Sequence, residues 1–140
     1  MKRTDRFPET STFHYFDANP ADRITTDCVI RAVCMFTRKT WAETYRDLTE
    51  VGIENSIDGQ DVKGVELYLA KYGWQKMKQP RKADGSKYTA REFCQQIAKA
   101  GSVYVLSLAN HLTYVSETRQ IWDIWDCGGK CVGNYWVRKL

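Results

Sequence analysis

The chain turns from polar to apolar within residues 25–34, which read TTDCVIRAVC. Thr26 or Asp27 is a suitable N-cap for a helix. The apolar residues that follow recur at helical spacing, and they are Val29, Ile30, Val33 and Phe36. This pattern predicts a helix from about Cys28 to Arg38, with Cys28 in its first turn. Unpaired N–H groups and the positive end of the helix dipole favour an anion there, which lowers the pKa of a thiol from its reference of about 8.5. Cys28 is therefore a candidate nucleophile.

A nucleophilic thiol needs a base, and the chain has two histidines. His14 lies in a polar and aromatic N-terminal segment, where we expect a partly exposed surface residue. His111 opens the alternating run HLTYV, residues 111–115, which predicts a strand. His111 is thus the better candidate for the base.

A second alternating run, IWDIW at residues 121–125, follows after a predicted turn. If the two runs form a hairpin, the carboxylate of Asp123 or Asp126 comes near the imidazole of His111. Side-chain alternation places Asp123 on one face with its apolar neighbours, whereas Asp126 belongs to the next turn, so we favour Asp123. The pattern predicts Cys28 as nucleophile, His111 as base and Asp123 as the residue that orients the imidazole.

Four segments carry a resemblance to a known family: TDCVIRA at 26–32, HLTYV at 111–115, IWD at 121–123 and CVGNYW at 131–136. Together they resemble small members of the papain-like cysteine peptidase superfamily from bacteria and their phages. The resemblance implies a nucleophilic cysteine at a helix start and a histidine and an Asp or Asn on the antiparallel sheet that follows. Cys28, His111 and Asp123 match those places. The implied activity is hydrolysis of a peptide, isopeptide or amide bond.

The chain departs from that pattern at two points. Thr26 stands where similar proteins have a glycine, and no upstream glutamine is placed to act as the oxyanion-hole donor. The backbone N–H of Cys28, the side chain of Asn19 and a protonated Asp22 remain as candidate donors. These departures leave open an alternative, in which a catalytically weak or inactive papain-like scaffold acts as a phage-encoded accessory or host-interaction binding protein.

Composition places the chain among globular proteins. With 140 residues, 43% of them hydrophobic and 13% aromatic, residues 1–140 fit one domain with a single core. The charged start MKRTDR is not followed by an apolar signal region, and the five cysteines are an odd number. We therefore expect reduced thiols and a cytoplasmic protein, in the host cytoplasm if the chain is phage-encoded.

No cofactor or metal is expected. Cys127 and Cys131 could form half of a zinc site, but no second Cys or His pair has the required spacing.

Periodicity and capping predict α+β architecture, with N-terminal helices packed on a C-terminal antiparallel sheet as in a papain-like layout. Residues 1–24 are expected to form an extended arm that its aromatic residues anchor on the domain. Further helices are expected to start after Thr40, to span about Asp61 to Tyr72, and to run from Thr89 to Gly101. Strands are predicted at 102–108, 111–116, 120–125 and 131–138, joined as a meander.

Residues 75–87 form a basic segment that carries Lys76, Lys78, Arg81 and Lys82 against one acidic residue. With a net charge of +4, this segment could contact nucleic-acid phosphates or an acidic protein patch. The plainer interpretation is a solvated loop turned by Pro80 and Asp84-Gly85. We expect a peptide or protein substrate or partner, no membrane association, and leave the oligomeric state open.

Overall fold

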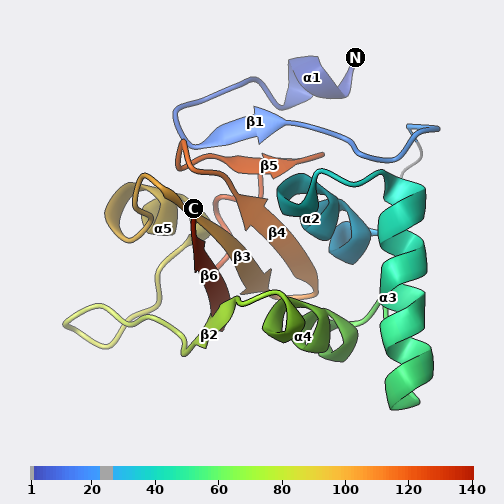
Figure 1. Ribbon diagram of the computed structural model, residues 1–140. Coiled ribbons are helices and arrows are strands. Elements are labelled where there is room, and N and C mark those ends of the chain that lie inside the picture. The colour runs from blue at the N-terminus through green and yellow to red at the C-terminus, as the bar shows by residue number, and fades with distance from the viewer. Residues whose placement is uncertain (1, 23–26) are drawn as a thin grey trace.

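The computed structural model describes residues 2–22 and 27–140, and this part of the chain is α+β (Figure 1). Its helices are α1 (Arg3–Arg6), α2 (Cys28–Thr37), α3 (Trp41–Asn55), α4 (Val62–Lys71) and α5 (Ala90–Gln96). Its strands are β1 (Phe13–Tyr15), β2 (Gln75–Met77), β3 (Ser102–Leu108), β4 (His111–Val115), β5 (Ile121–Asp123) and β6 (Tyr135–Lys139). The predicted fold class is thus confirmed at the level of α+β. No helix in the described ranges is both long and apolar enough to cross a membrane.

The strands form one mixed sheet in the order β1-β5-β4-β3-β6-β2. Strands β3, β4 and β5 are joined as an antiparallel meander, as predicted. The fourth strand is not the next in the meander, because β6 pairs with β3 on its other side. The connection before β6 is tied to the start of α5, where Lys130 accepts a hydrogen bond from the Ala90 N–H and Val132 donates one to Tyr88. These bonds hold residues 130–132 beside the start of α5, and β6 therefore begins only at Tyr135.

Both edges of the sheet come from segments outside the predicted C-terminal block. The N-terminal arm contributes β1, which runs parallel to β5 and buries Phe13 completely. It is therefore laid on the domain as expected, but as a strand preceded by one helical turn. Strand β2, which lies between α4 and α5 in the sequence, pairs with β6 at the opposite edge. The expected order of helices first and sheet last is therefore only partly right, because β1 and β2 precede the C-terminal strands in the sequence.

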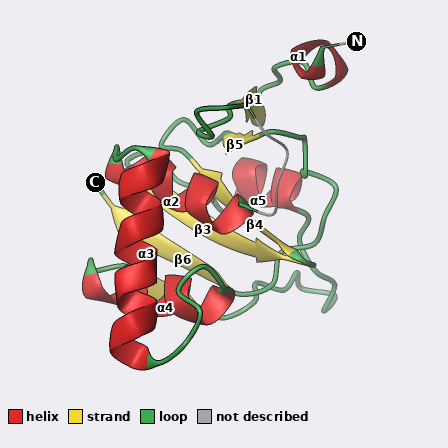
Figure 2. Ribbon diagram, turned by 90° about the vertical axis from the view of Figure 1, so that its right-hand side faces the viewer, coloured by secondary structure: helices red, strands yellow, loops and turns green. Residues whose placement is uncertain are grey.

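Helices cover both faces of the sheet. Helices α2, α3 and α4 pack on one face, around buried residues that include Val33, Leu48 and Leu69, and α5 packs on the other around Phe93. Figure 2 shows the strands passing behind α2, α3 and α4. Each face therefore has its own apolar cluster, where the composition had suggested a single core.

The predicted capping boxes start α3 and α5. The side chains of Thr40 and Thr89 each accept from the backbone N–H three residues on, and the Glu at that position reaches back. Helix α5 ends at Gln96 and not at Gly101, because the N–H of Ala98 returns to the Phe93 carbonyl and the N–H of Lys99 donates to the Tyr104 hydroxyl. Strand β5 is also shorter than predicted.

Candidate active site

Cys28 is the first residue of α2, as its position in the sequence predicts. Asp27 is the N-cap residue, but its side chain makes no capping hydrogen bond. Its buried carboxylate instead accepts a hydrogen bond of 2.9 Å from the indole N–H of Trp41. The other proposed cap, Thr26, lies outside the described residues. The first N–H groups of α2 are thus not used by the Asp27 side chain.

The other two predicted residues, His111 and Asp123, lie beyond the last paired residues of β4 and β5. These strands pair only through Tyr114↔Trp122 and Val115↔Ile121. They separate toward His111 and Asp123, and α2 contacts both strands on that side (Figure 1). The start of α2 can therefore approach the imidazole and the carboxylate where the sheet opens.

His111 and Asp123 form a short hydrogen bond, with 2.6 Å between the imidazole Nε2 and the carboxylate Oδ2. The His111 side chain is 8% exposed and Asp123 is 5% exposed, so water hardly competes for this bond. The indole of Trp125 covers the imidazole, with ring centroids 5.0 Å apart. Asp126, the alternative carboxylate, lies 3.9 Å from the Arg91 guanidinium instead. The structure thus brings Asp123, and not Asp126, to His111, and leaves the Nδ1 atom of His111 free for a second contact.

Three further side chains hold the Asp123 carboxylate. The hydroxyl of Thr113 donates to Oδ2 at 2.7 Å, and the thiol of Cys127 donates to the same oxygen at 3.7 Å. The guanidinium of Arg31 lies 3.8 Å from Oδ1, which also accepts the N–H of Ile124 at 2.7 Å. A carboxylate with this many partners is fixed in one orientation.

Sequence reasoning missed these supporting residues. Thr113 shares the alternating face of His111 on β4, so strand parity could have indicated it. Arg31 is a cation on an otherwise apolar helical face, four residues after Asp27. A charged residue at such a position could have indicated a buried ion pair. Cys127 was considered only as a zinc ligand. No sequence pattern indicates its contact with Asp123.

Arg31 connects two buried carboxylates. Its guanidinium lies 3.5 Å from Asp27 and 3.8 Å from Asp123, and the residue is only 7% exposed. A buried cation is tolerated when opposite charges surround it. Arg31 therefore links the N-cap of α2 with the carboxylate that binds the imidazole.

The electrostatics favour a charged Cys28–His111 pair. Burial lowers the pKa of His111, but the hydrogen bond to Asp123 and contacts with Cys127 and Cys28 outweigh it and raise that pKa to about 11. Burial raises the pKa of the Cys28 thiol, while His111, the Leu112 backbone and Arg31 outweigh burial, so that this pKa is lowered overall. Shifts in these opposite directions favour transfer of the thiol proton to the imidazole, which would give a thiolate beside an imidazolium.

The other cysteines lack this environment. Burial raises the pKa of the thiols of Cys34, Cys94 and Cys127, the last against a contact with His111. Cys131 is exposed and forms an isolated β-bridge with Thr89. Cys28 is therefore distinguished by its surroundings and not merely by its exposure.

Within residues 2–22 and 27–140, one group of side chains could hold a metal ion. His111, Asp123 and Cys127 offer ligand atoms that all lie within 4.8 Å of one another. Nitrogen and oxygen ligands of one tetrahedral zinc ion lie about 3.3 Å apart, from bond lengths of about 2.0–2.1 Å. The His111–Asp123 distance of 2.6 Å is shorter, and it fits a shared proton better than a shared metal. The two cysteines first considered for zinc differ in burial, since Cys127 is buried and Cys131 exposed.

The candidate oxyanion donors are placed differently. Asn19 is buried beside Asp27, with its Nδ2 atom 3.4 Å from the Asp27 carboxylate and its carbonyl oxygen bound by the Ala21 N–H. Asp22 is exposed, at a left-handed backbone position with φ of 51°. Of the two side chains, only Asn19 lies next to the start of α2.

His14 lies on β1 opposite Trp122, and its side chain contacts other groups than the three candidate residues. Its Nδ1 atom lies 3.0 Å from the exposed Glu9 carboxylate, and its ring packs on Trp122 at 4.3 Å between centroids. This matches the expected surface role.

The basic segment is partly neutralised. Lys76 pairs with Glu66 at 3.2 Å, and Lys82 pairs with Glu92. Arg81 donates to the Gly85 carbonyl within its own loop, whereas Lys78 makes no ion pair with the described residues. Contact with nucleic acid remains a prediction.

Comparisons with protein-family models, curated proteins and solved structures find no match to this chain. The arguments for function accordingly rest on the geometry of the site.

Proposed function

We propose that this protein is a papain-like cysteine hydrolase that cleaves a peptide, isopeptide or amide bond through Cys28, His111 and Asp123. The observation that supports the proposal is the buried 2.6 Å bond between His111 and Asp123 beside a cysteine that begins a helix. A nucleophile, a base and a residue that orients the base are the parts that acyl transfer needs. A reduced Cys28 also fits the cytoplasm, where thiols stay reduced.

The chemistry follows from the charged pair. The Cys28 thiolate attacks the carbonyl carbon, and the carbonyl electrons move onto oxygen. When the tetrahedral intermediate collapses, the carbon–nitrogen bond breaks and the His111 imidazolium gives its proton to the leaving amine. Neutral His111 then takes a proton from water, whose oxygen attacks the thioester and releases the acid with the Cys28 thiolate. Asp123 holds the imidazole ring in place throughout.

The oxyanion is stabilised in this proposal by the Cys28 backbone N–H at the start of α2, with Asn19 as the side-chain donor. Asn19 Nδ2 has one further hydrogen beyond its long contact with Asp27. The loss of one oxyanion donor typically costs on the order of 100-fold or more in rate. Asn19→Ala should therefore lower kcat by about that factor and leave alkylation of Cys28 unchanged.

A non-catalytic binding protein on the same scaffold is the second candidate. The observation that favours it is the engagement of Asn19 with Asp27 in the absence of an upstream glutamine. On this view the basic segment holds a partner, and Cys28→Ala retains full binding. Substitution of Lys78, Arg81 and Lys82 would then abolish it.

The first test measures iodoacetamide alkylation of each cysteine by peptide mapping, between about pH 5 and pH 9. Cys28 should label at least about tenfold faster than exposed Cys131 at about pH 6, because only an ionised thiol reacts. His111→Ala should remove this advantage, and His14→Ala is the matched control. Equal labelling of Cys28 and Cys131 would refute the activated thiolate.

The second test asks for acyl transfer. The protein is mixed with p-nitrophenyl acetate, and the burst of nitrophenol is compared with the concentration of Cys28. The proposal predicts a burst that Cys28→Ser abolishes and Cys131→Ser retains. A fast-labelling Cys28 that forms no acyl-enzyme with this ester or with a fluorogenic peptide library would favour the binding protein.

A further inference from the structure

A cavity of about 310 Å³ lies at the end of α2 opposite Cys28. Met35, Phe36 and Arg38 contribute from the helix end, and Val103, Tyr114 and Arg138 contribute from the sheet. Helix α2 runs from Cys28 to Thr37, which separates the cavity from the thiol by about 14 Å at 1.5 Å per residue. This cavity is therefore distinct from the candidate active site, and its volume falls at the lower end of small-molecule pockets.

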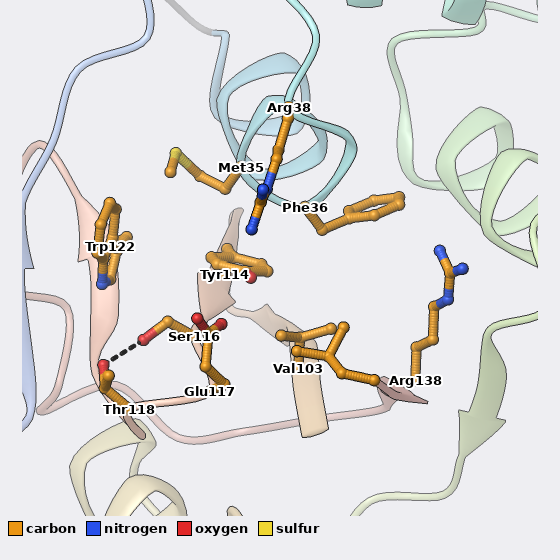
Figure 3. A pocket seen from close by; sticks show the side chains of 11 residues that line it. Met35, Phe36, Arg38, Val103, Tyr114, Ser116, Glu117, Thr118, Trp122 and Arg138 are labelled. Atoms are coloured by element: carbon orange, nitrogen blue, oxygen red, sulfur yellow. Dashed lines mark hydrogen bonds between the residues drawn. The ribbon is translucent and has the colours of Figure 1, made fainter. Parts of the chain in front are cut away.

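Two cations face the cavity without a partner. Neither Arg38 nor Arg138 makes an ion pair with any residue in the described ranges. Arg38 ends α2 in the left-handed conformation, with φ of 57°, and in Figure 3 its guanidinium reaches over the Tyr114 ring. Arg138 rises from β6 on the other flank, beyond Phe36 and Val103 (Figure 3). Guanidinium groups held on two separate elements suit a planar anionic group.

The walls between these cations are apolar and aromatic. Tyr114 is buried, and Phe36 is braced by Trp74 at 4.4 Å between ring centroids. Trp122 also lines the cavity, and its indole N–H is buried with no hydrogen-bond partner in the described part of the chain.

We propose that this cavity binds a small aromatic anion. Its carboxylate, sulfonate or phosphate is held by Arg38 and Arg138, and its ring packs on Phe36, Tyr114 and Val103. The Glu117 carboxylate points into the cavity from the turn after β4 (Figure 3), and it disfavours a ligand with more negative charge than the two arginines neutralise. The site does not involve Cys28 and stands whether or not the protein is a hydrolase.

The test compares two fluorescent probes that differ in one sulfonate: 8-anilinonaphthalene-1-sulfonate and neutral N-phenyl-1-naphthylamine. The sulfonate probe should bind the wild type about tenfold more tightly, as expected for one or two charge-assisted contacts. Arg38→Met and Arg138→Met should each remove most of this preference and leave the neutral probe unaffected. Arg46→Met, at an exposed position on α3, is the matched control. Glu117→Gln should tighten the sulfonate probe several-fold.

An NMR measurement locates the probe. The indole N–H signal of Trp122, identified by its loss in Trp122→Phe, should shift on addition of the sulfonate probe. Equal affinity for both probes, or sulfonate binding that survives the double substitution of Arg38 and Arg138, would overturn the proposal. So would a Trp122 signal that stays in place while other indole signals move. The Cys28→Ala variant should bind the sulfonate probe normally, which separates this result from the proposed hydrolase.

Discussion

The substitution Asp123→Asn tests the central electrostatic argument. Asparagine has nearly the same shape as aspartate and its oxygen can still accept from Thr113, but it carries no charge. The imidazole of His111 then loses the carboxylate at 2.6 Å, which is the strongest influence that raises its pKa. We expect His111 to become neutral near pH 7 and Cys28 to return its proton.

The size of the effect can be bounded. Raising the pKa of His111 from about 6.5 to about 11 corresponds to roughly 6 kcal/mol at 1.36 kcal/mol per unit, and Asp123 supplies only part of this, with Cys127 and Cys28. At about pH 6 a thiol with the reference pKa of about 8.5 is only about 0.3% ionised. Complete loss of the charged pair would therefore slow alkylation of Cys28 at that pH by as much as about 300-fold, and a loss of at least tenfold is expected.

The assay is the iodoacetamide pH profile of Cys28 in the wild type, Asp123→Asn and Asp126→Asn. The Asp126 variant removes a neighbouring carboxylate that pairs with Arg91, so it controls for general charge and folding. Near-UV circular dichroism checks that each variant is folded. A folded Asp123→Asn protein whose profile overlays that of the wild type would show that Asp123 does not sustain the thiolate, and the triad argument would fail.

Three further predictions concern stability. His111 keeps its proton in the folded state between about pH 6.5 and 11, so its contribution to the free energy of unfolding falls as pH rises through that window, whereas the lowered pKa of Cys28 contributes in the opposite sense up to about pH 8.5. Between about pH 6.5 and 8.5, the free energy of unfolding of Cys28→Ser, measured with urea, should therefore fall with pH more steeply than that of the wild type, by up to about 1.4 kcal/mol per pH unit. Parallel curves would contradict the charged pair. Arg31→Met should cost about 3–5 kcal/mol in urea unfolding because it leaves two buried carboxylates without their shared cation, and a cost below about 1 kcal/mol would mean that Arg31 is not needed between them. Thr89→Ala should cost about 1 kcal/mol through loss of the α5 cap, and an unchanged unfolding midpoint would show that the bond from Ala90 to Lys130 alone fixes that helix start.

The local features of this fold were predictable from the sequence, and the long-range ones were not. Capping boxes at Thr40 and Thr89 mark their helices because the signal lies within four residues. The placement of β6 next to β3 depends on bonds between residues about 40 positions apart in the chain, such as Val132 with Tyr88, which no periodicity reports. The role of β1 was missed for a second reason, because a three-residue strand has too little alternation to be recognised.

The same distinction holds at the site. Helical spacing and strand parity indicated Cys28, His111 and Asp123, because each lies at the end of an element whose pattern is readable. The contacts that fix Asp123 come from α2, from β4 and from the turn that holds Cys127. They depend on how β4 and β5 separate, which the sequence pattern does not specify.

The charges around Asp123 favour a thiolate at Cys28, which is partly buried. Asp27, Arg31, Asp123, His111 and Cys28 make a row of neighbouring ionisable groups that carries one net negative charge once the two carboxylates and the guanidinium are ionised. Transfer of the proton from Cys28 to His111 leaves this net charge unchanged, so it avoids the large penalty of bringing a new charge into the protein. In the proposed mechanism, acylation of Cys28 removes the thiolate and leaves the imidazolium with Asp123 as its anionic partner. The proton on His111 is then held less tightly at the moment when the leaving group needs it.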